Sequence, residues 1–183
     1  MDYVDKMRGS IKTPFARKSL KHVNSFKAMD VMRRASELES SGRKIIHLEV
    51  GEPDFPTVAP IVDAAKKALD EGLTQYTSPT GIVDLKYRLS ELYSRRHGLS
   101  VSPERILITP GASGGLVLLA NLLVEAGDEI LITDPAYPCV RNFIRLMSAT
   151  PRLIPIDAHR NFRPMVSQLE KANNSSTKGI WLA

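Results

Sequence analysis

The residues most suggestive of chemistry are a run of small ones, P-G-A-S-G-G at residues 110–115, between two apolar segments. Small residues let the backbone turn tightly and approach a ligand closely. A helix that follows such a turn presents free N–H groups and a partial positive charge, which suit a phosphate group. The spacing matches neither the dinucleotide fingerprint nor a nucleotide P-loop. A tight strand–helix connection without a ligand is the alternative interpretation.

A second run, D-P-A-Y-P at residues 134–138, follows the next apolar segment of the chain. In open parallel sheets, ligands bind at the carboxyl ends of the strands, and both runs follow predicted strand ends. Tyr137, which stands between two prolines, would present an aromatic face on which a flat cofactor ring stacks. A tyrosine that only packs at a helix start is the alternative interpretation.

Two further runs contain residues suited to ligand binding, G-E-P-D-F at 51–55 and Q-Y-T-S-P-T-G at 75–81. Gly51 ends a predicted strand and permits close approach of the backbone. Tyr76 offers a hydroxyl group on a loop between two predicted helices. Taken alone, each run also fits an ordinary surface turn.

The elements that must position these runs alternate along the chain. Apolar residues at helical spacing predict helices at about 29–40, 57–71, 82–96, 116–124, 139–147 and 165–172. Short apolar runs predict strands at about 44–50, 105–109, 129–133, 152–156 and 179–183. This alternation predicts an α/β fold, a three-layer α/β/α arrangement with a mostly parallel sheet. The last predicted strand reaches Ala183 with no crossover after it, so we expect an incomplete sheet.

The composition, 43% hydrophobic and 25% charged, is that of an ordinary globular protein. The sequence has no apolar run of the ~18–20 residues that a membrane span needs, and no secretory signal pattern. The single cysteine fits a reducing compartment, and we expect a cytoplasmic protein. The basic excess lies in residues 1–44, without the dense cluster of a nucleic-acid reader. The four histidines are too far apart to suggest a metal site.

In their order along the chain, the four runs resemble the first half of the class I/II aminotransferases, which are fold-type-I enzymes that use pyridoxal 5′-phosphate. The resemblance covers about residues 29–183. It implies that residues 1–44, the N-terminal arm and first helix, form part of the small domain of such an enzyme. Residues 45–183 would then form the first part of its large, cofactor-binding domain, truncated at Ala183.

The resemblance also implies roles for single residues. The backbone of Gly51 would lie near the carboxylate of the substrate, and the ring of Tyr137 would stack on the pyridine ring. Tyr76 would bind the cofactor phosphate of the other subunit of a homodimer. The phosphate of the same subunit would be held by Gly111, Ala112 and Ser113.

The activity implied is transfer of an amino group between an amino acid and a 2-oxo acid. In this family the cofactor is held as a Schiff base by a lysine that has no counterpart before Ala183, so we name no catalytic residue and expect the 183-residue chain alone to be inactive. A lyase or decarboxylase of the same fold is one alternative. A non-catalytic effector domain that binds the cofactor is another, although the arm of about 28 residues is too short for an upstream DNA-binding domain.

Overall fold

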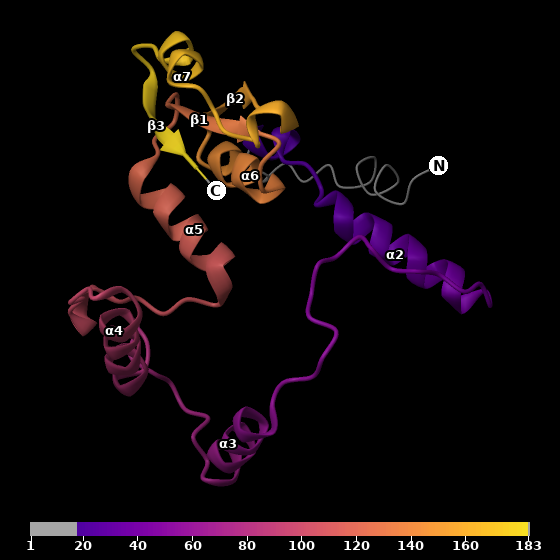
Figure 1. Cartoon of the computed structure of the whole chain (residues 1–183), viewed down its shortest axis with the longest axis vertical. Helices are drawn as coiled ribbons and strands as arrows, with labels where there is room; N and C mark the ends of the chain where they lie inside the picture. The colour runs from indigo at the N-terminus through magenta and orange to yellow at the C-terminus, as the bar shows by residue number, and fades with distance from the viewer. Residues whose placement is uncertain (1–17, 183) are drawn as a thin grey trace. The chain divides into compact units, whose positions relative to one another are not determined.

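The computed structural model describes residues 18–182, and Figure 1 labels its helices and strands. The chain divides into two units. One unit is Lys27–Gly115, and the other joins Leu116–Ala183 to Met1–Phe26.

The unit Lys27–Gly115 consists of helices and extended connections. Its helices are α2 (Lys27–Ser40), α3 (Ala59–Asp70), α4 (Val83–His97) and the short 3-10 helix η2 (Pro103–Arg105). The three predicted α-helices are confirmed within about two residues at each end. Gly98 ends α4 in the left-handed conformation, with its N–H donated to the carbonyl of Ser94. Helix α3 begins at Ala59 after the N-cap residue Val58, two residues beyond the start predicted at about residue 57.

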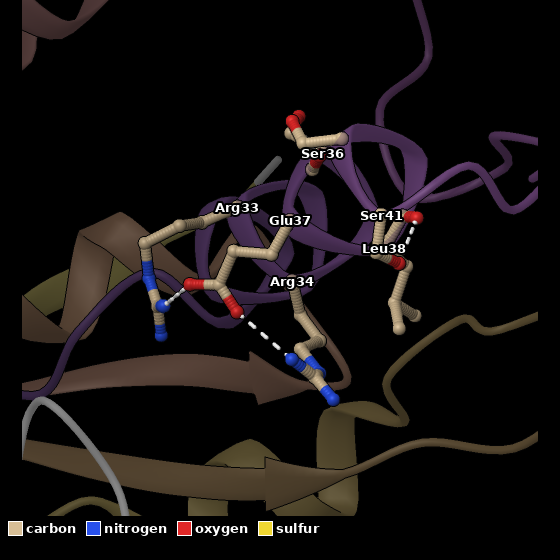
Figure 2. A network of polar contacts seen from close by, with 7 residues as sticks. Arg33, Arg34, Ser36, Glu37, Leu38 and Ser41 are labelled. Atoms are coloured by element: carbon tan, nitrogen blue, oxygen red, sulfur yellow. Dashed lines mark hydrogen bonds and ion pairs between the residues drawn. The ribbon is translucent and has the colours of Figure 1, made fainter.

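Helix α2 is stabilised by contacts among its own polar side chains (Figure 2). The guanidinium groups of Arg33 and Arg34 both donate to the carboxylate of Glu37, the latter over 3.0 Å. These bonds, the one from Arg34 first, lower the pKa of Glu37. The hydroxyl of Ser41 donates to the carbonyl of Leu38 over 2.6 Å, which satisfies an acceptor at the end of the helix.

Two predicted strands of this unit, 44–50 and 105–109, are not found as strands. Among residues 27–115, all of which the structure describes, no backbone ladder forms. Residues 44–50 and 106–109 are extended or bent, Arg105 belongs to the 3-10 helix η2, and the backbone hydrogen bond from Ile108 to Thr80 does not by itself make a strand. Ile46 and Leu48 are accordingly 81% and 89% exposed. An apolar pattern predicts an extended backbone, but a strand also requires a second segment with which to exchange hydrogen bonds.

The other unit contains a three-stranded parallel sheet in the order β2-β1-β3. The strands are β1 (Glu129–Asp134), β2 (Thr150–Pro155) and β3 (Thr177–Trp181). Helices precede and separate them: α5 (Gly111–Leu123), whose first five residues belong to the unit Lys27–Gly115, then α6 (Pro138–Leu146), α7 (Val166–Ala172), and the 3-10 helices η1 (Lys18–His22) and η3 (Ala158–Arg160). The predicted α/β class with a parallel sheet is therefore confirmed.

The core of this unit lies around the central strand β1. Leu131 and Ile132 point to opposite faces of the sheet, and each is 1% exposed. Burial on both faces explains why this strand reads as a continuous apolar run. One face packs against α6 through a cluster that includes Ile144, which is 0% exposed. Within residues 18–182, no helix has both the length and the apolar character needed to cross a membrane.

Candidate functional site

The run of small residues at 110–115 forms the first turn of α5, which begins at Gly111. The prediction of a separate loop before a helix at Leu116 was therefore wrong. A Cβ at Gly114 would lie 3.4 Å from Cβ of Thr109, and one at Gly115 would lie 3.4 Å from its hydroxyl oxygen. Both glycines therefore lie against Thr109, at distances where a Cβ would make an ordinary van der Waals contact.

This first turn has the donors that a phosphate group requires. Gly111, Ala112 and Ser113 are exposed at the start of a helix of 13 residues. Their backbone N–H groups precede the first intrahelical hydrogen bonds, and the helix dipole adds a partial positive charge at the same place. The turn is therefore suited to bind a phosphate group.

The loop that carries Tyr76 is joined to the segment leading into this turn. The N–H of Ile108 donates to the carbonyl of Thr80 over 3.1 Å. Gly81, with φ at +104°, lies so close to Ile108 that a Cβ would stand 2.4 Å from its Cγ1 atom. The structure thus brings the predicted Tyr76 loop and the phosphate turn together through one hydrogen bond and one close contact. The side chain of Tyr76 itself is fully exposed.

Tyr137 is the N-cap residue of α6. An ion pair joins Asp134, three residues before it, to Arg141, four residues after it. The guanidinium of Arg141, one turn into the helix, donates to the carboxylate of Asp134. The ring of Tyr137 is 39% exposed and meets the ring of Phe26 edge-on, with centroids 6.2 Å apart at 80°. A ring that is held at its edge and partly exposed is suited to stack on a flat cofactor ring.

Gly51 lies in an exposed segment that follows a cluster not foreseen from the sequence. In this cluster, His47 bridges two carboxylates: its Nδ1 lies 2.6 Å from Oε1 of Glu49, and its Nε2 lies 3.1 Å from Oε1 of Glu39. The bond with Glu49, followed by that with Glu39, raises the pKa of His47, and the same bond lowers the pKa of Glu49. The cluster ties the end of α2 to the segment that leads into Gly51.

A cavity of about 470 Å³ opens where the strands of the sheet end. It is lined by Thr133 at the end of β1, Ile156 after β2 and Leu182 after β3, together with the loop residues Phe162 and Arg163. The carboxyl ends of parallel strands are the usual place for a ligand in this class of fold.

The predicted site residues are divided between the two units. Gly51, Tyr76 and Gly111–Ser113 belong to the unit Lys27–Gly115, and Tyr137 belongs to the other. The roles implied for these residues stay predictions. Sequence reasoning missed the contacts of the arm with α6, because the residues that meet there are 118 positions apart.

Comparison with known proteins identifies the family. Residues 43–183 match the family described as Aminotransferase class I and II. A relative from Methanocaldococcus jannaschii, named (5-formylfuran-3-yl)methyl phosphate transaminase, is 43% identical over 163 residues, which is 89% of this chain and 42% of the relative. An aspartate aminotransferase from Pyrococcus horikoshii is 37% identical over 84% of this chain and 38% of the relative.

Solved structures agree with these relatives. A Methanococcus jannaschii protein, described as similar in its active site to kynurenine aminotransferases, superposes with a TM-score of 0.80 at 42% identity, over 91% of this chain and 43% of that one. The aspartate aminotransferase of Thermus thermophilus, solved with maleate, gives a TM-score of 0.84 at 28% identity, over 90% and 43%.

The neighbours confirm the predicted α/β architecture as that of the aminotransferases, of which the chain represents the N-terminal portion. The chain spans about two fifths of the length of the curated relatives that it matches. The match to the family extends over most of the chain and includes all four runs from Gly51 to Tyr137. This chain belongs to the class I and II aminotransferases.

Proposed function

We propose that this protein is a pyridoxal-phosphate-dependent aminotransferase that moves an amino group between an amino acid and a 2-oxo acid. The main support for the proposal is the start of α5. This N-terminus of a helix is suited to bind a phosphate group, and it lies within the part of the chain that matches the family. The relatives described above are named transaminases, which favours amino-group transfer over a lyase or decarboxylase reaction. When bound, pyridoxal phosphate supplies an electron-accepting ring to the carbon that carries the amino group.

In the proposed site, the residues of this chain bind the cofactor and orient it and the substrate. The N–H groups of Gly111, Ala112 and Ser113, with the hydroxyl of Ser113, hold the phosphate. Tyr137 lies against one face of the pyridine ring and fixes its plane. The backbone at Gly51 borders the place of the substrate carboxylate, where a glycine leaves room for close approach.

We further propose that the protein acts as a cytoplasmic homodimer and that Tyr76 reaches the cofactor phosphate of the partner subunit. The full exposure of its side chain, which leaves it accessible to a second subunit, supports this role. The expected result is that Tyr76→Phe weakens cofactor binding only at protein concentrations at which the chain is dimeric. A loss of affinity that is the same in dilute, monomeric samples would assign Tyr76 to its own subunit.

A binding measurement tests the proposed function on the 183-residue chain. The ligand is pyridoxine 5′-phosphate, which carries the ring and phosphate of the cofactor but an alcohol in place of the aldehyde, so it does not react with surface lysines. We expect saturable binding by calorimetry, with competition by inorganic phosphate. Ser113→Ala should weaken it about 10- to 100-fold, the effect of removing a hydrogen bond to a charged group worth about 1.5–3 kcal/mol.

The matched control is Ser94→Ala, which removes a hydroxyl from α4, away from the phosphate turn. This variant should keep the affinity of the unaltered chain. The absence of saturable binding, or equal effects of the two serine substitutions, would contradict the proposal.

A further inference from the structure

The arm that precedes α2 is attached to α6 by polar contacts over several residues. The guanidinium of Arg145 donates to the carbonyl of His22 over 2.9 Å. The side-chain amide of Asn142 then grips the backbone of Asn24 twice: its Oδ1 accepts from the N–H over 3.1 Å, and its Nδ2 donates to the carbonyl over 2.7 Å. All of these residues belong to one unit, so the attachment is internal to it.

This paired contact fixes the arm more strictly than a single hydrogen bond would. One amide group satisfies both the donor and the acceptor of the same backbone residue, as a neighbouring strand does in a sheet. It leaves Asn24 little freedom to rotate or to slide along α6. Only Ser25 separates Asn24 from Phe26.

Phe26 connects the arm to Tyr137 and limits the motion of the Tyr137 ring. Its ring meets that of Tyr137 edge-on, an arrangement that aromatic quadrupoles favour. On the other side of Tyr137, Pro138 and the pair formed by Asp134 and Arg141 hold the backbone. The ring is therefore fixed from the arm, and its backbone is fixed from the helix.

We propose that Phe26 and Asn142 are positioning residues for the cofactor: Asn142 holds the arm, and the arm sets the orientation of the Tyr137 ring through Phe26. This inference rests on the proposed function, since it takes the stacking role of Tyr137 as given. It adds two residues that do not touch the cofactor but that determine how well the stacking ring is presented to it.

A double-mutant cycle tests the path through Tyr137. Dissociation constants for pyridoxine 5′-phosphate are measured for the 183-residue chain and for Phe26→Leu, Tyr137→Leu and the double variant. Loss of the stacking ring should weaken binding about 2- to 10-fold. Phe26→Leu should weaken it about twofold in the unaltered chain and have no further effect when Tyr137 is leucine, because residues that act as a unit are not additive.

The role of Asn142 is tested with a matched pair of asparagine substitutions. Asn142→Ala removes both bonds to the arm, whereas Asn24→Ala keeps them, because Asn24 takes part only through its backbone. With the five tyrosines replaced by 3-fluorotyrosine, the ¹⁹F signal that disappears in Tyr137→Leu reports the surroundings of that ring. We expect Asn142→Ala and Phe26→Leu to shift this signal in the free chain, and Asn24→Ala to leave it in place.

The outcomes separate the two proposals. If Tyr137→Leu does not weaken ligand binding, the stacking role fails and this inference fails with it. If Tyr137→Leu weakens binding but Phe26→Leu has no effect, or if the two effects add, only the positioning role is overturned. An unshifted ¹⁹F signal in Asn142→Ala would equally overturn the role of the arm, whatever the ligand does.

Discussion

Replacement of Gly81 by alanine should separate the Tyr76 loop from the segment that leads into the phosphate turn. The added Cβ would stand 2.4 Å from Cγ1 and 2.5 Å from Cβ of Ile108, and the residue would have to keep φ at +104°. Because Cβ of Ile108 is fixed by the backbone, rotation of its side chain cannot relieve the overlap. Backbone strain of this kind costs about 1–3 kcal/mol, and overpacking costs about as much again.

The amide of Ile108 reports this change directly, because it donates to the carbonyl of Thr80 next to Gly81. A local destabilisation of at least about 2 kcal/mol should speed its hydrogen exchange at least about 25-fold. The exchange is followed by mass spectrometry on a peptide that contains Ile108. Weaker binding of pyridoxine 5′-phosphate should accompany the faster exchange, because the phosphate turn begins three residues later.

Gly98→Ala is the matched control for this substitution. Gly98 also has a positive φ, +66°, but a Cβ there would meet no atom within 4 Å. Its left-handed backbone should cost about 1–2 kcal/mol at the end of α4, without faster exchange at Ile108. If Gly81→Ala changed the exchange of Ile108 no more than Gly98→Ala does, the close contact would not hold the loop and this reasoning would be refuted.

Three other perturbations have defined outcomes. Ile144→Ala, which empties a fully buried position against the sheet, should lower the free energy of unfolding by about 2–5 kcal/mol in a denaturant titration. In an NMR titration His47 should show a pKa above its ordinary value, and Glu49→Gln should lower that pKa more than Glu39→Gln does. The pKa of His47 is raised and that of Glu49 is lowered, so the contribution of this pair to the free energy of unfolding should be fully present near about pH 5–6. The contribution should be lost as the pH rises through the raised pKa of His47. It should also be lost as the pH falls through the lowered pKa of Glu49. Ile180→Lys on the edge strand β3 should reduce concentration-dependent association in sedimentation experiments, because a charge blocks pairing between sheet edges. Equal association of the altered and the unaltered chain would show that β3 is not the strand through which the chain associates.

The sequence determined the local elements because their signals are local. The apolar spacing of α4 and the glycine after it predicted the bounds of that helix. The continuous apolar run of β1 predicted a strand buried on both faces of the sheet. The four runs that carry the site were also recognisable, because each consists of residues with particular backbone or ring properties. Their roles follow from the family resemblance and remain to be tested.

The tertiary structure decided what depends on partners distant in the chain. The segments 44–50 and 105–109 have the apolar pattern of strands. A strand also needs a second segment that pairs along its length, and the described residues 27–115 form no such ladder. The glycines from Gly111 suggested a loop because helix propensity disfavours them, whereas in the structure they form the start of α5, next to Thr109. The grip of Asn142 on the arm had no sequence signal at all, because hydrogen bonds between residues 118 positions apart exist only after the chain has folded.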